Sequence, residues 1–157
     1  MNVELWLKRC LDHEGGYWDD PVGGPTKWGI SQRSYPDLDI TELTVYDAVE
    51  IYKRDYIAPL GLENYPPGVA FQLFDFGVNS GPVTAIKQLQ EALGLKSDGI
   101  AGPITRAKLA ATSDSDLVML VVAERLDFMA DLRNFTPNAG GWVKRMAKNL
   151  RYGAVDT

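Results

Sequence analysis

The chain has 157 residues, a formal net charge of −5, 45% hydrophobic and 24% charged residues. This length suffices for one domain with its own core, and the composition is that of a soluble globular protein. The acidic balance argues against nucleic acid as a main partner, since such binding depends on a basic surface. One histidine and one cysteine cannot form a zinc cluster or an internal disulfide, so we expect no metal and no cofactor.

A first helix is predicted up to Glu14, with Asn2 as its N-cap. Its apolar residues recur at helical spacing: Val3, Trp6, Leu7, Cys10 and Leu11. The same stripe reaches Glu14 in the last turn, before Gly15 and Gly16 end the helix. Partial burial and the negative end of the helix dipole both raise the pKa of such a carboxyl group, which can then act as a general acid. The alternative is a helix-end glutamate whose carboxyl group reaches solvent.

Residues 17–30 are rich in glycine, proline and tryptophan, which predicts tight turns and a small β-hairpin. Asp19, Asp20 and Thr26 supply carboxylates and a hydroxyl group beside aromatic rings. An acid, a second carboxylate and a hydroxyl group that positions water are the groups that glycoside hydrolysis requires. This stretch is therefore the candidate active site.

Periodicity, capping boxes and proline positions predict helices along the rest of the chain. The expected ranges are 31–36, 45–56, 69–78, 82–94, 103–111, 114–133 and from 142 onward, with a loop over 135–141. The last helix is expected to turn four apolar residues inward: Trp142, Val143, Met146 and Leu150.

Asp75 lies within the strongly apolar helix predicted at 69–78, and Asn79 follows one turn later. A carboxylate there must find partners or stay neutral. One interpretation is a buried hydrogen-bonded pair with a structural role. The other is a functional role for Asn79, with or without Asp75.

Several motifs carry a resemblance to a known family. The segments 14–17 (Glu-Gly-Gly-Tyr), 23–26 (Gly-Gly-Pro-Thr), 29–31 (Gly-Ile-Ser) and 74–81 (Phe-Asp-Phe-Gly-Val-Asn-Ser-Gly) resemble the signature of the phage-type N-acetylmuramidases of glycoside hydrolase family 108. Residues 98–102 (Asp-Gly-Ile-Ala-Gly), with Thr105, Gly141 and Trp142, are similar to the peptidoglycan-binding region of these enzymes.

The resemblance implies a mainly α (α+β), lysozyme-like fold, a helical bundle with a small β-hairpin element near residues 17–30. It further implies a muramidase region at 1–91 and a peptidoglycan-binding-like helical region at 92–157, packed as one compact body. The family places more residues between its catalytic glutamate and the Gly-Gly pair than this chain does.

The activity implied is cleavage of the β-1,4 bond between N-acetylmuramic acid and N-acetylglucosamine, with Glu14 as the acid. Asp20 or Asp19 would be the second carboxylate, and Thr26 would position water. Tyr17, Trp28 and Asn79 would bind the sugars. Direct attack by water would invert the anomeric configuration. Two alternatives are a lytic transglycosylase acting on the same bond and a non-catalytic peptidoglycan-binding protein.

We expect a monomer whose partner is the glycan strand of bacterial peptidoglycan. From Leu132 to Val155 the chain has no acidic residue, and Lys144, Lys148 and Arg151 share one helical face. This face could make weak contact with the wall or the outer membrane, or simply be solvated. With no apolar run long enough to span a membrane and no signal-peptide pattern, the resemblance implies a phage endolysin. It would accumulate in the host cytoplasm and act in the periplasm or cell wall after membrane permeabilisation.

Overall fold

The computed structural model describes the backbone of residues 2–14, 18–20 and 24–156, and the side chains of these residues except 12–14 and 18–20. The chain divides into two compact units, Met1–Asp55 and Tyr56–Thr157. The division predicted at 91/92 concerns two regions of the family resemblance and not the compact units of the structure. It stays a prediction. Within the described part of the chain, no helix is both long and apolar enough to cross a membrane.

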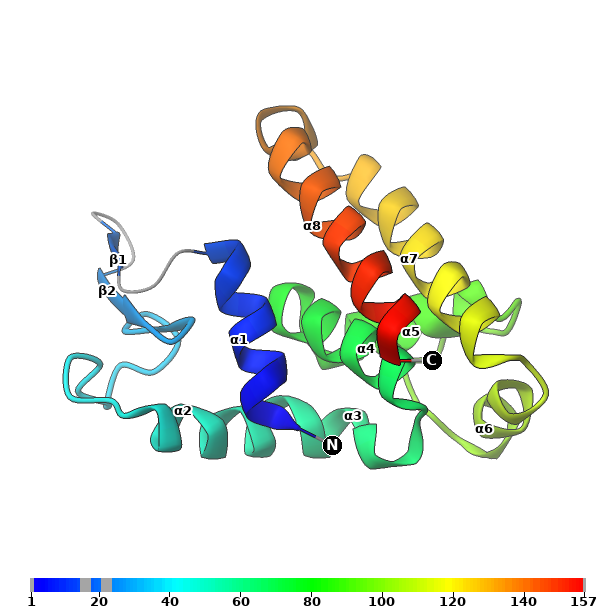
Figure 1. Ribbon diagram of the computed structural model, residues 1–157, viewed down its shortest axis with the longest axis horizontal. Coiled ribbons are helices and arrows are strands. Elements are labelled where there is room, and N and C mark those ends of the chain that lie inside the picture. The colour runs from blue at the N-terminus through cyan, green and yellow to red at the C-terminus, as the bar shows by residue number, and fades with distance from the viewer. Residues whose placement is uncertain (1, 15–17, 21–23, 157) are drawn as a thin grey trace. The chain divides into compact units, whose positions relative to one another are not determined.

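The first unit combines two helices with a small antiparallel sheet (Figure 1). Its elements are α1 (Val3–Glu14), β1 (Trp18–Asp20), β2 (Gly24–Lys27), β3 (Ile30–Ser31) and α2 (Val45–Tyr52). Asn2 caps α1 as predicted, because its Oδ1 accepts a hydrogen bond from the Leu5 N–H at 3.0 Å. The predicted hairpin is also present, with β3 as an additional strand beside β2.

The short helix predicted at 31–36 is wrong, because turns follow β3 there. The side chain of Gln32 explains the difference. Its Nε2 donates to the carbonyl oxygens of Tyr35 at 3.1 Å, Pro36 at 2.9 Å and Leu38 at 2.8 Å. These carbonyl groups are thus satisfied by a side chain, and the segment needs no helical hydrogen bonds.

The helix predicted at 45–56 begins as expected with a capping box between Thr44 and Asp47. After α2 the chain passes through one turn of π-helix, η1 (Lys53–Ile57), and a short helix, α3 (Ala58–Leu60). The chain thus stays helical through Pro59, beyond the predicted end at 56, since proline is tolerated in the first turn of a helix. Gly61 ends α3 with a left-handed φ of 63°.

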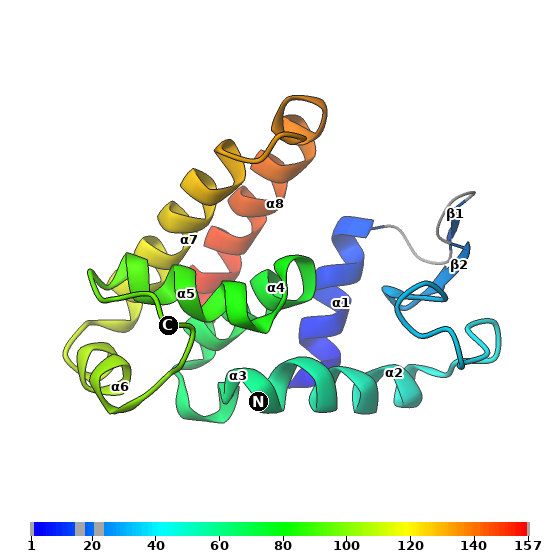
Figure 2. The same cartoon turned by 180° about the vertical axis from the view of Figure 1, so that it is seen from behind.

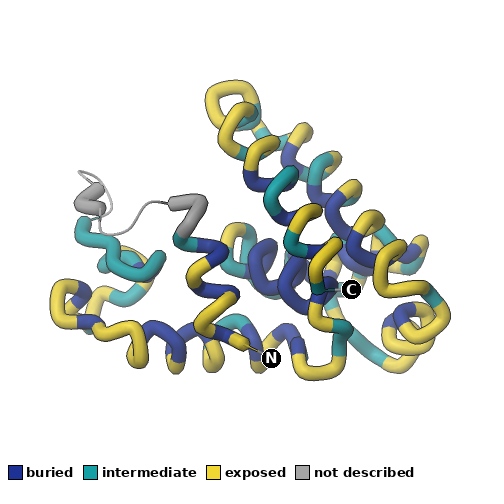
Figure 3. The backbone as a smooth tube through the Cα atoms, viewed as in Figure 1, coloured by how far each residue is buried: buried dark blue, intermediate teal, exposed yellow. Residues whose placement is uncertain are grey.

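The second unit is built around a buried helix, α4 (Pro67–Ser80), which agrees with the prediction at 69–78. The other elements are the 3₁₀ turn η2 (Leu62–Asn64), α5 (Pro82–Ala92), α6 (Pro103–Ala110), α7 (Asp114–Ala130) and α8 (Phe135–Asp156). Helices α5, α7 and α8 all pack against α4, whose residues 68–77 are buried (Figure 3). Two opposite views show α7 and α8 side by side as an antiparallel pair (Figure 1, Figure 2).

Helix α8 begins at Phe135, so the loop predicted at 135–141 is wrong. Pro137 falls in the first turn, where its missing N–H is not needed. The rings of Phe135 and Trp142 lie 6.0 Å apart and pack on the core, which stabilises this turn in spite of Gly140 and Gly141.

The inward face of α8 also differs from the prediction. Val143 and Leu150 are 52% and 40% exposed, whereas Met146 is buried as expected. The buried side of the helix carries Arg145 and Asn149 instead. These two polar residues lie on the buried side in place of the predicted apolar ones, because both bind a carboxylate on another helix.

That carboxylate is Asp75 on α4, which has no exposed surface. Arg125 Nη1 lies 2.5 Å from Asp75 Oδ2, and Arg145 Nη2 lies 2.6 Å from Oδ1. The amide of Asn149 donates to Oδ2 at 2.7 Å. We call Asp75, Arg125, Arg145 and Asn149 the buried ion cluster. It connects α4, α7 and α8, and it confirms a structural role for Asp75.

The pairing with Asn79 takes a different form from the one expected. Asn79 Nδ2 donates to the backbone carbonyl of Asp75 at 2.6 Å, not to its carboxylate. The carboxylate is held by the two arginines and Asn149, which lie 50 to 74 residues away in the sequence.

We predict that Asp75→Asn lowers the free energy of unfolding by about 3–5 kcal/mol, because it leaves buried guanidinium groups without their anion. Urea unfolding followed by circular dichroism measures the change. Asp127→Asn is the control, since Asp127 is exposed on the same helix as Arg125, and it should change stability by no more than about 0.5 kcal/mol. A loss below about 1 kcal/mol for Asp75→Asn would contradict this role.

The same cluster predicts a pH dependence. Burial alone would raise the pKa of Asp75, but the charges and hydrogen bonds of Arg125 and Arg145 outweigh it and hold the pKa well below its usual range. The unfolded chain has a pKa of about 3.9 at this group. The stabilisation is therefore fully present above that pH and is lost as the pH falls toward the folded-state pKa. Unfolding scans from pH 6 to pH 2 should show a smaller acid-induced loss in Asp75→Asn than in the unmodified protein.

Candidate active site

Glu14 is the last residue of α1, as predicted. Val3, Trp6, Leu7 and Cys10 are buried on one face of this helix. Glu14 follows Cys10 by four residues, so its position continues the buried stripe. The side chain of Glu14 lies outside the described residues, as does all of Tyr17.

The pairing of the strands shows which of the other candidate residues lie next to one another. The Cα atoms of Asp20 and Gly24 are partners, Asp19 pairs with Pro25, and Thr26 pairs with Trp18 on one side and Ser31 on the other. Both candidates for the second carboxylate thus lie on β1 beside the strand that carries Thr26. Their side chains lie outside the described residues.

Thr26 and Ser31 are directly opposite residues and so share one face of the sheet. Both are half-buried. The opposite face carries Ile30, which is only 2% exposed and anchors the sheet. Thr26 therefore stands on the face of the sheet away from Ile30.

Trp28 and Gly29 form the turn between β2 and β3, with φ values of 56° and 75°. Two positive φ angles are what a two-residue type I′ hairpin turn requires. For a bulky residue this conformation costs about 1–2 kcal/mol, so other contacts must hold it. The indole Nε1–H donates to the Leu43 carbonyl at 3.2 Å, and the Tyr52 hydroxyl donates to the Trp28 carbonyl at 3.1 Å.

These contacts limit which part of Trp28 is available to a ligand. The indole N–H is used within the protein, so Trp28 can offer a sugar its ring but not its polar edge. Strained residues that the surrounding structure holds in place are typical of functional sites. Tyr52, which sequence reasoning did not single out for the site, is the residue that links the turn to α2.

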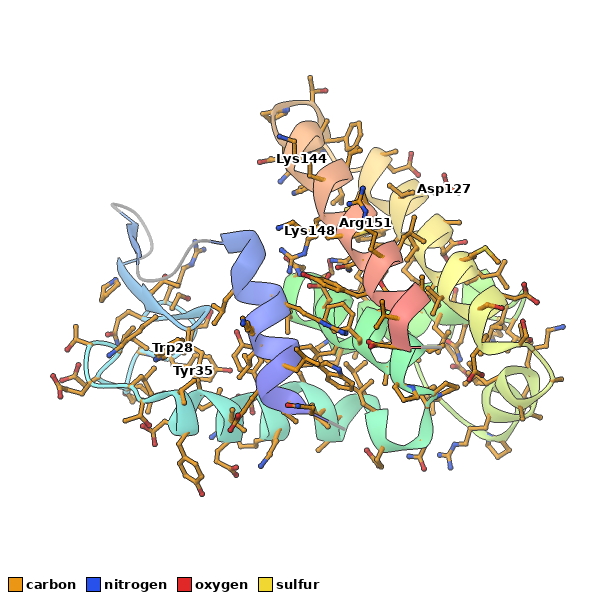
Figure 4. All side chains as sticks on the ribbon, viewed as in Figure 1. Trp28, Tyr35, Asp127, Lys144, Lys148 and Arg151 are labelled. Carbon is orange, nitrogen blue, oxygen red and sulfur yellow. The ribbon has the colours of Figure 1, made fainter. Side chains whose placement is uncertain are left out.

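The loops after β3 are held by similar side-chain contacts. Lys27 Nζ donates to the Thr41 carbonyl at 2.6 Å, and the Tyr35 hydroxyl donates to Asp55 Oδ2 at 2.7 Å. Hydrogen bonds from Arg54 lower the pKa of Asp55 more than partial burial raises it, and Tyr35 contributes in the same direction. Trp28 and Tyr35 lie between the sheet and α2 (Figure 4).

Asn79, the remaining candidate for sugar binding, is exposed at the end of α4 in the second unit. Its Nδ2 is engaged with the Asp75 carbonyl. Among the described residues, no group of three or more His, Cys, Asp or Glu side chains is arranged to hold a metal ion.

Comparison with known proteins shows which proteins this chain resembles. Residues 7–81 match the family model for glycosyl hydrolase 108, a segment that contains Glu14, the sheet and α4. The structure of SagA from Brucella abortus is similar over 98% of this chain and 94% of that chain, with a TM-score of 0.87 and 26% sequence identity. A search of curated proteins found no match.

Residues 7–81 are thus similar to glycosyl hydrolase family 108, and this match supports a glycosidase. The match to this family suggests a peptidoglycan hydrolase. The predicted fold class, mainly helical and lysozyme-like with a small β element, is confirmed by the elements described above and by the SagA comparison.

We predict that Tyr52→Phe destabilises the protein by about 1 kcal/mol, because it removes the hydrogen bond to the Trp28 carbonyl. Thermal and urea unfolding provide the measurement. The matched control is Tyr46→Phe on the same helix, since Tyr46 is 70% exposed. Equal stability of the two variants would show that Tyr52 does not hold the turn.

Proposed function

We propose that this protein is an N-acetylmuramidase that hydrolyses the β-1,4 bond between N-acetylmuramic acid and N-acetylglucosamine in peptidoglycan. The observation that carries the proposal is the family match over residues 7–81. The geometry supports the proposal in two ways. Glu14 is the last residue of α1, the helix that carries the buried stripe, and Asp19, Asp20 and Thr26 lie on adjacent strands.

In the proposed reaction, Glu14 donates its proton to the glycosidic oxygen as the bond to the anomeric carbon breaks. Asp20, or alternatively Asp19, accepts a proton from a water molecule that attacks the same carbon. Thr26 orients that water through its hydroxyl group. Tyr17 and Trp28 bind the sugars through their rings, with Asn79 as a further contact. Direct attack by water would invert the anomeric configuration.

We predict that Glu14→Gln lowers hydrolysis of purified sacculi by at least about a hundredfold, because loss of a general acid typically has an effect of this size. Release of reducing sugar measures the rate. Glu4→Gln is the control, since Glu4 is exposed in the first turn of the same helix. Circular dichroism verifies that both variants are folded. Activity of Glu14→Gln close to the unmodified rate would reject the proposal.

Mass spectrometry of the products separates the proposal from its alternatives. Hydrolysis yields a reducing N-acetylmuramic acid end, whereas a lytic transglycosylase yields an anhydro-sugar. A non-catalytic binding protein would sediment with sacculi and release nothing, with or without Glu14→Gln. The family match to a glycoside hydrolase favours hydrolysis.

The proposed partner is the glycan strand of peptidoglycan, with α8 as an additional electrostatic contact. Lys144, Lys148 and Arg151 lie along one side of α8 (Figure 4). Lys144 and Arg151 are exposed. Such a basic face would offset the net charge of −5 when the protein approaches an anionic wall. We propose a lytic, endolysin-type role for the protein, which it would perform as a monomer after synthesis in the host cytoplasm, once the host membrane is permeabilised.

We predict that the double variant Lys144→Gln/Arg151→Gln sediments less with sacculi at low salt, by about threefold or more, and equals the unmodified protein at high salt. Cosedimentation at two ionic strengths measures this. The control is Lys53→Gln/Lys96→Gln, which removes two charges elsewhere. An equal reduction in the control would mean that overall charge, not α8, decides wall contact.

A further inference from the structure

The second unit contains a cavity of about 360 Å³ that the proposed reaction does not use. It lies among α3, the segment after η2, α6 and the start of α7. Its apolar floor is formed by Leu60, Leu109 and Pro66, of which the two leucines are buried. The polar lining includes Tyr65, Arg106 and Asp114. A cavity of this size, lined both by apolar residues and by polar groups that can orient a molecule, suits a small ligand.

The wall that carries Arg106 is fixed by a buried glutamine. Gln90 is 2% exposed, and its Nε2 donates to Asp98 Oδ1 at 2.8 Å, to the Ile100 carbonyl at 3.1 Å and to Thr105 Oγ1 at 3.2 Å. Its Oε1 accepts from the Gly99 N–H at 2.8 Å. This network holds the loop before α6 in one conformation. A pre-organised wall lowers the entropy that ligand binding must offset.

The orientation of Arg106 is also fixed by a hydrogen bond. Its Nε donates to the carbonyl of Ala101 at 3.0 Å, and both residues line the cavity. A guanidinium group held through Nε retains its two terminal nitrogens for a carboxylate. Burial raises the pKa of Tyr65 more than the nearby Arg106 lowers it, so its hydroxyl group stays a hydrogen-bond donor at neutral pH.

The charges of the lining indicate what kind of ligand fits. Arg106 and Tyr65 can donate to a carboxylate, while Asp114 can accept from an ammonium group. A neutral sugar would use neither charge, but the short peptides attached to peptidoglycan carry both. We propose that this cavity binds the carboxylate-bearing end of a peptidoglycan stem peptide. The proposal rests on the proposed function, because that function identifies peptidoglycan as the substrate.

Isothermal titration of the full chain with the tetrapeptide L-Ala-D-Glu-meso-diaminopimelate-D-Ala tests the proposal. We expect binding that Arg106→Gln weakens by about tenfold or more, the effect of losing a charge-assisted hydrogen bond. Tyr65→Phe should weaken binding less than Arg106→Gln does. The same tetrapeptide with its carboxylates amidated should bind the unmodified protein as weakly as the original tetrapeptide binds Arg106→Gln. Lys108→Gln is the matched control, since Lys108 is exposed on α6 and does not line the cavity.

A second measurement separates this proposal from the proposed function. Cleavage of glycan strands freed of peptide should be the same for Arg106→Gln and the unmodified protein, while cleavage of intact sacculi by the variant is slower. Absence of tetrapeptide binding, or equal binding by Arg106→Gln and Lys108→Gln, would overturn the peptide site even if glycan is hydrolysed. Tetrapeptide binding without hydrolysis of any glycan would overturn the proposed function and leave the site standing.

Discussion

The second unit depends on a single buried carboxylate. Asp75 has no contact with solvent, yet it is charged, since Arg125 and Arg145 both reach it. Charges removed from water are tolerated only when their partners are correctly placed. Because the partners come from α7 and α8, those helices must adopt one register against α4. We infer that the buried ion cluster selects this packing over shifted alternatives, which a purely apolar seam would tolerate better.

Close packing around α4 reinforces this constraint. A Cβ added to Gly77 would lie 2.9 Å from Leu60 Cδ1, so the Leu60 side chain would have to shift to admit any larger residue. On the other side the ring of Phe71 meets Tyr152 edge-on at 5.5 Å. The Arg125 guanidinium group lies 4.8 Å from the centroid of the Phe76 ring, so the charge is enclosed by an aromatic surface as well as by the carboxylate.

The features predicted correctly from sequence are those that local rules determine. The Asn2 cap, the Thr44 capping box and the hairpin depend on residues close in the chain. The apolar sequence of α4 predicts directly that this helix is buried. The errors arose where distant partners decide the outcome. Arg145 turns inward only because Asp75 is there, and α8 begins at Phe135 because its ring packs on the core. The candidate site rests on a motif and a helical stripe and stays a prediction, whereas Tyr52, which holds the strained turn, carries no local signal.

The two units are stabilised in different ways. In the second, long helices bury an apolar surface and one charged cluster. In the first, strands of two to four residues are too short for backbone pairing alone to hold a sheet. Side chains supply the difference: Trp28, Lys27 and Gln32 each bond to backbone carbonyl groups beyond the sheet. Such contacts fix β2, the turn at Trp28 and the segment after β3. A site placed on so small a sheet needs supports of this kind, because catalytic groups must be held accurately.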